Sequence, residues 1–566
     1  MESDRKLELV FLWHMHQPDY RDHATGEFRR PWTYLHALKD YTDMAAHLER
    51  NPQVRAVVNF VPVLLEQIED YARQFDTGEF RDPLLRLLAR DTLDQLAADE
   101  RSLVLTTCFP GNHVRMVAPY PRFERLRNLY RLLEGHGDTA ATYLSGAFFA
   151  DLLVWYHLVW TGETERRSRT LLAELMTKGE NFTLDDRRRL LSLMGSTLRE
   201  IIPRYRALAE RGQIELSATP DTHPLAPLLL DFASAREAQP DIPLPLAHVY
   251  PGGRSRVDRH IALARESHGR RFGQSPAGMW PAEGALSTAF LQQLAAQGCR
   301  WTASSQGVLA NSLRGSHVEP SRNHLYHPWR IETAPGIAIF FRDEKLSDLI
   351  GFEYAKWHGR DAAQHFVEQL ARIRDEAPAG ETPLVCVMLD GENAWEHYPY
   401  NAYFFFEDLY GLIAEQPWLA TTTCADWLAR NPQRSEKLPA LVAGSWVYGT
   451  FSTWIGDIDK NRAWDLLCAA KQAYDLVIGS GRLDTADQDA AEAQLAVCEG
   501  SDWFWWFGDY NPREAVQSFD ALFRANLAHL YRLLRLTEPP QLAVPLSSGG
   551  GSPEGGGAMR RASQLS

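Results

Sequence analysis

The sequence predicts an α/β fold in which parallel strands alternate with helices, and we favour a closed barrel over an open doubly wound sheet. Short apolar runs with strand character are separated by helical patterns, which is typical of a parallel sheet with right-handed crossovers. Several of these runs end in a polar or charged side chain, at His16, Glu215, Glu283 and Asp390. In a barrel such residues gather at one mouth, where catalytic groups usually lie.

The predicted strands are short apolar runs bounded by turn residues. They cover residues 7–12, 212–216, 277–280, 301–304, 337–341 and 384–389. After residue 440 the strand signals fade, and helical periodicity is found at residues 462–478, 484–498 and 513–536.

We divide the chain into three parts. Residues 1–439 are expected to form a catalytic β/α barrel with a helical insertion around residues 119–178. Residues 440–541 are expected to form a C-terminal helical domain, and the Gly/Ser-rich residues 542–566 a disordered tail with little apolar surface to bury.

Composition excludes some classes of function. The 566-residue chain has a formal net charge of −14, which argues against a nucleic-acid binder because such proteins need a basic surface to displace counterions. Its six cysteines form no C-x-x-C pair, so reduced buried thiols are expected. We find no signal sequence and no apolar segment long enough to span a bilayer, so we expect a cytoplasmic protein with no membrane partner.

Two carboxylates stand beside tryptophans at the ends of strand-like runs. Glu283 follows Trp280-Pro281, and Asp390 follows a fully apolar run and precedes Trp395. Cleavage of a glycosidic bond needs two carboxyl groups, and indole rings hold sugars, so carbohydrate chemistry is the leading hypothesis. The spacing also fits structural roles, with Glu283 at a helix N-terminus and Asp390 as a cap. Further acidic residues and a histidine crowd Asp390, and the sequence does not rank them.

The first predicted strand ends in Trp13-His14-Met15-His16-Gln17-Pro18. His14 and His16 share one face of an extended strand, so they also fit the first ligand pair of a barrel metallohydrolase, with His223 and Asp390 as further ligands. A hydrogen-bonded core histidine is the more common explanation. The aromatic run at residues 502–510 is interpreted as packing between helices.

Taken together, the motifs resemble glycoside hydrolase family 57, in particular its amylopullulanase and α-amylase branch. The resemblance runs from about Leu9 to Leu536 and includes five motifs in order. The motifs are His16-Gln17-Pro18, Gln213 to Leu216 with His223 to Leu225, Trp280 to Glu283, Leu389 to Asn393, and Thr453 to Trp464.

The resemblance implies an incomplete (β/α)7 barrel with helical insertions and a C-terminal helical domain over the cleft. It implies that Glu283 is the nucleophile and Asp390 the acid/base of a retaining enzyme that acts on α-glucans through α-1,4 and, as a second option, α-1,6 linkages. We also expect six substrate-binding residues, no cofactor and no metal. The substrate-binding residues are His16, Glu215, His223, Trp280, Trp395 and Trp454.

Two positions depart from the family pattern: Asp221 stands where an aromatic residue is common, and Gln306 where an acidic one is usual. Three alternatives remain open. A 4-α-glucanotransferase or branching enzyme would use the same catalytic pair. A metal-dependent barrel hydrolase would use His14 and His16, and a non-catalytic glucan-binding protein would keep only the tryptophans.

Overall fold

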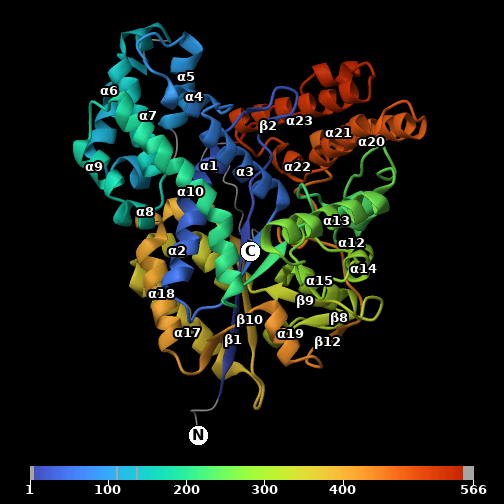
Figure 1. Ribbon diagram of the computed structural model, residues 1–566. Helices are drawn as coiled ribbons and strands as arrows, with labels where there is room; N and C mark the ends of the chain where they lie inside the picture. Colours follow the sequence, from blue (N-terminus) through green and yellow to red (C-terminus); the bar gives the residue numbers. More distant parts are fainter. Residues whose placement is uncertain (1–4, 110–111, 135–137, 552–566) are drawn as a thin grey trace.

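The computed structural model describes residues 5–109, 112–134 and 138–551 (Figure 1). Its centre is a curled sheet in which seven strands stand in the order β10-β1-β4-β5-β6-β7-β9. These are β1 (Leu7–Met15), β4 (Ala56–Phe60), β5 (Ile214–Ala218), β6 (Gly278–Met279), β7 (Trp301–Ser305), β9 (Ala338–Arg342) and β10 (Leu384–Asp390). All six pairings along this row are parallel, as the sequence predicts.

The two end strands of this row, β9 and β10, approach each other without pairing along their length. The sheet therefore forms an incomplete (β/α)7 barrel. The backbone N–H of Asp343 donates to the carbonyl of Cys386 at 2.8 Å, and Arg342 Nε donates to the carbonyl of Met388 at 2.8 Å. In the described part of the chain, β9 and β10 meet through these contacts and not through a strand ladder. The predicted barrel is therefore confirmed.

Three short strands extend the barrel sheet, and one of their pairings is antiparallel. β8 (Trp329–Ile331) runs antiparallel to β9, β12 (Glu436–Leu438) pairs with β8, and β11 (Leu419–Thr421) pairs with the start of β1. The sheet is therefore mixed at its edge. A separate hairpin of β2 (Arg21–Asp22) and β3 (Glu27–Phe28) follows β1.

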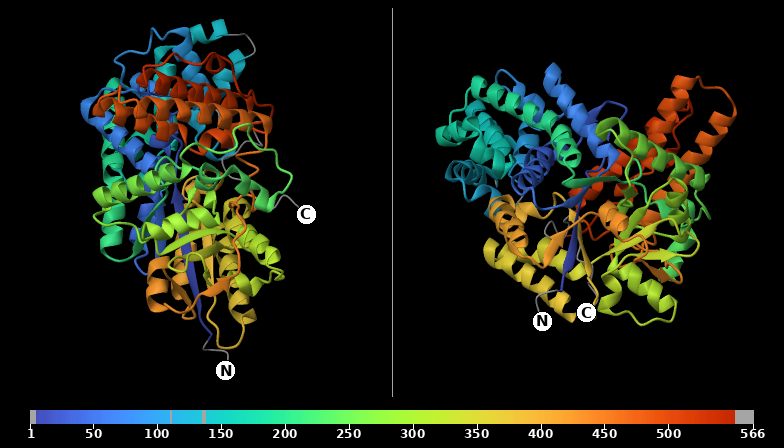
Figure 2. Two further views of the ribbon diagram at one scale, coloured as in Figure 1. Left: turned by 90° about the vertical axis from the view of Figure 1, so that its right-hand side faces the viewer. Right: turned by 60° about the horizontal axis from the view of Figure 1, so that its bottom comes forward.

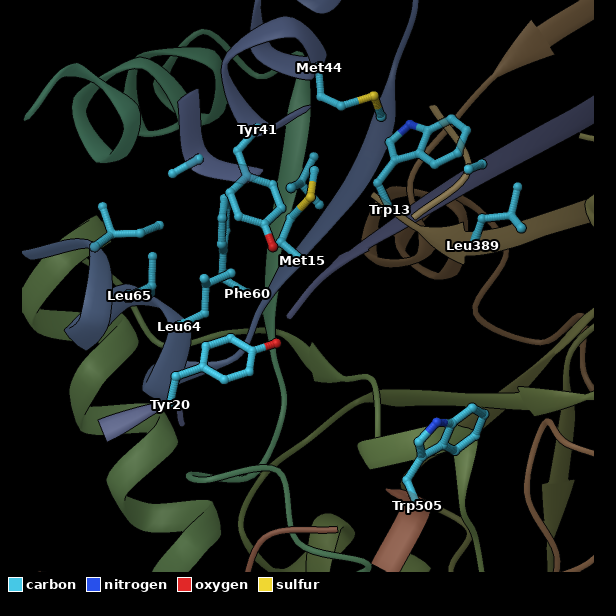
Figure 3. Packing of buried hydrophobic residues seen from close by; sticks show 14 of the residues in the cluster. Trp13, Met15, Tyr20, Tyr41, Met44, Phe60, Leu64, Leu65, Leu389 and Trp505 are labelled. Atoms are coloured by element: carbon cyan, nitrogen blue, oxygen red, sulfur yellow. The ribbon is translucent and has the colours of Figure 1, made fainter. Parts of the chain in front are cut away.

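The central position of β1 follows from its sequence. Eight of its nine residues are buried, because β10 and β4 flank it and helices cover the outside of the barrel. Figure 3 shows Trp13 and Met15 of this strand in the same buried cluster as Tyr41 and Phe60. Residues from distant parts of the chain thus share one core around β1.

Helices cover the outside of the barrel. Apart from the insertion described below, the helices between the barrel strands are α1 (Trp32–His36), α2 (Thr42–Arg50), α3 (Pro62–Thr77), α11 (Ala226–Leu230), α12 (Ala235–Ala238), α13 (Gly253–Phe272), α14 (Thr288–Ala296), α15 (Gln306–Gly315), α16 (Glu344–Asp348), α17 (Gly359–Glu376) and α18 (Tyr403–Glu415). The short helix α19 (Cys424–Arg430) differs, because its Cys424 and Trp427 share a buried cluster with Val10 and Leu12 of β1. None of the helices in the described ranges is long and apolar enough to cross a membrane.

The helical insertion lies between β4 and β5 and starts earlier than residue 119. It consists of α4 (Pro83–Ala89), α5 (Ala98–Cys108), α6 (Pro121–Glu134), α7 (Gly146–Val159), α8 (Glu163–Ser168), α9 (Thr170–Lys178) and the long α10 (Leu184–Glu210). Figure 1 shows this group over one side of the barrel end.

The C-terminal helices are α20 (Ile458–Gly479), α21 (Thr485–Cys498), α22 (Asp502–Trp506) and α23 (Arg513–Leu533). Figure 2 shows from two further sides that they lie over the same end of the strands as the insertion. Residues 440–456 still contact the barrel, because Gly444 and Leu286 form an antiparallel bridge. The predicted boundary at residue 440 therefore lies within a segment that packs on the barrel.

The chain after α23 packs against the helices for longer than the sequence predicts. The predicted tail begins at residue 542, but Leu542 and Ser547 are buried and the chain can be followed to Gly551. This part of the tail prediction is corrected, because Leu542 and Leu546 pack on the core and backbone hydrogen bonds hold the residues that follow. Residues 552–566 lie outside the described residues.

A buried ion-pair network joins α13 to the end of α21. The carboxylate of Glu499 accepts hydrogen bonds from Arg256 Nη2 at 2.8 Å, His260 Nε2 at 2.7 Å and the Tyr250 hydroxyl at 2.6 Å. Burial alone would raise the pKa of Glu499, but Arg256 and His260 lower it to about 2. The network therefore holds an ionised carboxylate between the barrel and the C-terminal helices.

Glu499→Gln is expected to lower the free energy of unfolding near pH 7 by about 3–5 kcal/mol, because Arg256 would stay buried without its main counter-charge. The wild-type pKa lies below the ordinary 4.5 of this carboxyl, so its stabilisation is present above pH 4.5 and is lost as the pH falls toward 2. Urea denaturation near pH 7 and near pH 3.5 measures both effects. The matched control is Glu492→Gln, since this partner of Arg256 is 28% exposed. Equal stability of the two variants near pH 7 would contradict the expectation.

Candidate active site

A large cavity opens at the carboxyl ends of the barrel strands, between the insertion and the C-terminal helices. Its volume is about 1180 Å³. Barrel residues on its wall are His14, His16, His223, Glu283, Arg342, Asp390 and Glu392. Tyr156 and Trp160 come from the insertion, and Asp502, Trp505 and Trp506 from the C-terminal helices. The barrel, the helical insertion and the C-terminal helices thus all contribute residues to the site.

Glu283 follows β6 in a short turn with a strained backbone. Its φ is +59°, in the left-handed region that costs a non-glycine residue about 1–3 kcal/mol. Trp446 makes two hydrogen bonds to Glu283. Its backbone N–H donates to the carbonyl of Glu283 at 2.9 Å, and its Nε1 donates to Glu283 Oε2 at 2.9 Å. The carboxylate is therefore fixed by a residue from beyond the last barrel strand.

Asp390 is the last residue of β10 and stands opposite His14 of β1. The next residue must be glycine, because a Cβ on Gly391 would lie 2.0 Å from the sulfur of Met15. Burial raises the pKa of Asp390 to about 6, while the hydrogen bond from Asn393 Nδ2 at 3.0 Å and the nearby Arg342 and His16 lower it. A carboxyl with this pKa can hold a proton near neutral pH and release it, as a general acid must.

Glu392 is a third carboxyl on the cavity wall, and the sequence did not rank it against Asp390. Its pKa is raised well above the ordinary value, first by burial and then by the charges of Asp390 and Asp40. Gln17 Nε2 donates to its Oε1 at 3.4 Å. Burial thus favours the protonated form of Glu392, which lies on the same cavity wall as Asp390.

Three histidines line the cavity beside the carboxyls. The rings of His16 and His223 stack with centroids 3.8 Å apart, and that of His14 lies 5.3 Å from His223. His16 Nε2 donates to Asp502 Oδ1 at 2.9 Å, and His223 Nδ1 bonds the hydroxyl of Ser501 at 2.9 Å. Burial, followed by the charges of neighbouring histidines, lowers the pKa of His223 and that of His14, the latter to about 3. His14 and His223 are therefore neutral hydrogen-bonding groups.

The same cluster contains a group of possible metal ligands. One ligand atom from each of His16, His223 and Asp502 lies within 4.8 Å of the others. However, the imidazole lone pairs lie in the ring planes, and the planes of His16 and His223 are only 19° apart. Stacked rings direct these lone pairs side by side, so they do not converge on one tetrahedral ion. His14, the other predicted ligand, uses Nδ1 to bond Asn59 Oδ1 at 2.7 Å.

Because these side chains do not converge on one ion, enzymatic activity is expected to be unchanged after a chelator has removed all divalent metal. The measurement compares turnover of a chelator-treated sample with an untreated one, together with the metal content of both. A loss of activity that zinc restores would contradict the expectation and favour the metal-dependent hydrolase.

Glu215, a predicted substrate-binding residue, does not line the cavity. It is the second residue of β5, which runs to Ala218 and not only to residue 216 as predicted. Its carboxylate accepts hydrogen bonds from Trp301 Nε1 at 2.6 Å and from the backbone N–H of Ala425 at 2.8 Å. Both contacts lie within the barrel, so Glu215 supports the sheet away from its carboxyl end. Asp221 and Gln306 are not among the cavity-lining residues either.

The three predicted tryptophans are buried behind the cavity wall. Trp280 packs against Trp446 and His14 at centroid distances of 5.1 and 6.1 Å. Trp395 donates from Nε1 to the carbonyl of Gly391 at 2.8 Å, and Trp454 is fully buried. These indoles therefore support residues that face the cavity.

Other aromatic residues form the wall itself. They are Tyr20, Trp32, Tyr156, Trp160, Trp446, Trp505 and Trp506. Trp503 and Phe504 pack in the core, as predicted for the aromatic run, whereas Trp505 and Trp506 face the cavity. The signal for these two was the unusual density of indoles near residue 505, but core packing explains such a run equally well.

A cavity of this size, lined by carboxyl groups, neutral histidines and indoles at the mouth of a barrel, is typical of an enzyme that binds sugars. The model of the family described as Glycosyl hydrolase family 57 matches residues 10–439. The chain therefore belongs to this family. No curated protein matches it.

Solved structures with similar folds include three named enzymes. The branching enzyme of Pyrococcus horikoshii is 18% identical with a TM-score of 0.58, and 94% of this chain and 93% of that chain are covered. The α-amylase of Thermotoga maritima is 14% identical with a TM-score of 0.56, and the covered shares are 94% and 93%. The 4-α-glucanotransferase of Thermococcus litoralis is 13% identical with a TM-score of 0.52, and the covered shares are 93% and 60%. At these identities the likeness concerns the fold.

Proposed function

We propose that this protein is a retaining glycoside hydrolase that cleaves α-glucans, with Glu283 as nucleophile and Asp390 as acid/base. The observation that supports this most is the unequal setting of two carboxyls on one cavity. Trp446 Nε1 binds the carboxylate of Glu283, while burial gives Asp390 a pKa of about 6. Glu283 is thus oriented as a nucleophile and Asp390 is set to donate a proton, which is the division of roles that retention requires.

The reaction proceeds in two displacements. Glu283 attacks the anomeric carbon as Asp390 transfers its proton to the leaving oxygen, and a glycosyl ester forms on Glu283. Asp390, now ionised, takes a proton from the incoming water. The water attacks the anomeric carbon and releases Glu283, so the product keeps the α configuration.

The neighbouring groups have supporting roles in this proposal. His16 and His223 bond hydroxyl groups of the sugar at the cleavage point, and His16 is oriented for this by Asp502. Trp446, Trp505 and Trp506 provide the aromatic wall. Trp280 and Trp395 act indirectly, through Trp446 and Gly391.

The α-glucan substrate rests on family membership and on the names of the structural neighbours, which are a branching enzyme, an α-amylase and a 4-α-glucanotransferase. The second candidate function is transfer, in which a sugar hydroxyl takes the place of water in the second displacement. A cavity enclosed by three parts of the chain and walled by indoles favours transfer, because it can hold an acceptor sugar and displace water.

Product analysis tests the proposal. The enzyme is incubated separately with maltooligosaccharides, amylose and pullulan, and both reducing ends and chain lengths are followed. Hydrolysis predicts a rise in reducing ends, and fragments from pullulan would show which linkages are cut. Longer or branched products at a constant number of reducing ends would favour transfer. No change in any α-glucan would overturn the proposal.

A further inference from the structure

The segment Leu546–Gly551, here called the C-terminal strap, lies at the rim of the cavity. Gly551 lines the cavity together with Pro512 and Arg513, and it pairs with Pro512 in a parallel bridge. The strap is rich in glycine and serine, a composition that favours a disordered tail. Because composition alone would leave it disordered, specific contacts must hold the strap in this position.

Polar contacts hold the first half of the strap. Asp520 Oδ1 accepts the backbone N–H of Leu546 at 2.7 Å and that of Ser547 at 3.4 Å. The hydroxyl of Ser547 accepts the backbone N–H of Gly508 at 3.0 Å, and Ser547 is only 3% exposed. These contacts tie the strap both to α23 and to the loop that follows α22.

The second half of the strap is connected to the aromatic wall through Asn511. The backbone N–H groups of Gly550 and Gly551 donate to the carbonyl of Asn511 at 3.2 and 3.0 Å. The side chain of Asn511 donates in turn to the carbonyls of Trp505 and Trp506 at 2.9 and 3.0 Å. Both indoles line the cavity, so the strap braces the end of α22, which carries them, through the loop that follows it.

Two glycines of the strap are required by close packing. Gly549 has a φ of +69°, and a Cβ there would lie 2.8 Å from Cγ2 of Val516. A Cβ on Gly551 would lie 2.1 Å from the carbonyl oxygen of Tyr510. The glycines therefore let the strap lie directly on the loop, which a chain with larger side chains could not do.

We propose that the C-terminal strap is a specificity-determining part of the site, which fixes Trp505 and Trp506 as a stacking surface for sugar units bound away from the cleavage point. This inference rests on the proposed function. Rings fixed before binding lose little conformational entropy when a sugar stacks on them, so long glucans gain from the strap. A short glucan that fills only the sugar sites next to Glu283 and Asp390 does not need it.

The test compares two truncations of the full chain. Deleting residues 546–566 removes the strap, and deleting residues 552–566 leaves it. The ratio of kcat/KM for amylose to kcat/KM for maltotriose is expected to fall about tenfold on loss of the strap, the order that one or two stacking contacts provide. It is expected to stay unchanged in the shorter deletion. The release of bound amylose, followed by tryptophan fluorescence, is expected to become faster only without the strap.

Point variants separate this role from general loss of folding. Ser547→Ala removes the acceptor for Gly508, and Ser548→Ala alters an exposed serine next to it. Only Ser547→Ala is expected to lower the ratio, with both variants folded by melting temperature. If the full-length protein is active and the ratio of kcat/KM for amylose to that for maltotriose is the same with and without the strap, this inference is wrong but the proposed function stands. A parent inactive on every glucan would overturn the proposed function and this inference with it.

Discussion

Glu283→Gln is expected to lower kcat/KM on every α-glucan by at least about 10⁴-fold, because no other group can form the glycosyl ester. The amide keeps the size of the side chain, so the hydrogen bond from the backbone of Trp446 to the carbonyl of residue 283 should remain. Substrate affinity should change little. Steady-state kinetics together with binding of an unreactive maltooligosaccharide separates the two effects.

The matched variant Glu283→Ala tests whether Glu283 acts as the nucleophile. Azide can occupy the space left by the carboxylate and attack from the same face, so part of the activity should return and a β-glycosyl azide should form. The wild-type product should appear first as the α-anomer, because two successive displacements at the anomeric carbon restore the configuration of the α-linked substrate. Proton NMR showing early β-anomer, or near wild-type turnover in Glu283→Gln, would refute the assignment.

Asp390→Asn is expected to change both the rate and its pH dependence. The wild-type acid must be protonated, and its pKa is about 6, so kcat/KM should fall as the pH rises through about 6. The variant should lose this limb. Its rate should fall by about 10²–10⁴-fold with ordinary glucans, but far less for bond cleavage in substrates whose leaving group needs no proton.

Glu392→Gln is the control for this prediction. Glu392 lies two residues along the chain and also lines the cavity, but burial raises its pKa well above the ordinary value, whereas the pKa of Asp390 rises to about 6. The amide variant should therefore keep the limb near pH 6 and lose much less activity than Asp390→Asn. If Glu392→Gln loses the limb and Asp390→Asn keeps it, the two roles must be exchanged.

The sequence predicts most of the barrel strands because each is a short run rich in apolar residues and followed by a helical pattern. Residues 384–389 and 301–304 were predicted as strands, and the structure places β10 and β7 there. The strand β4 (Ala56–Phe60) was missed, because Asn59 interrupts its apolar pattern. That polar residue is satisfied by contacts from other strands, with His14 Nδ1 and the Ser217 hydroxyl as partners. Such pairings cannot be seen along a single chain.

The candidate site was predictable where motif and strand end coincide. His16, Glu215, Glu283 and Asp390 were expected at the barrel mouth, and all of them except Glu215 line the cavity. His223, expected as a substrate-binding residue, lines it as well. Glu215 shows the limit of this reasoning, since an error of two residues in the end of β5 moves a side chain from the mouth into the barrel wall.

The aromatic wall was beyond prediction for a different reason. Whether an indole faces a cavity or the core depends on neighbours that are distant in sequence. Trp446 lies outside the predicted strands and becomes a partner of Glu283 only when residues 440–456 fold against β6. The strap illustrates the same point, because its partners are backbone groups that composition does not report.

The contact between Trp446 and Glu283 also bears on how the enzyme matures during synthesis. When the barrel strands have been synthesised, Trp446, which bonds the proposed nucleophile Glu283, has not yet been added to the chain. The donor of this bond emerges after the residues that the family model matches, which end at 439. The contacts that hold Glu283 can therefore form only late in synthesis, and a chimera joined at residue 439 would exchange the indole partner of Glu283 along with the C-terminal helices.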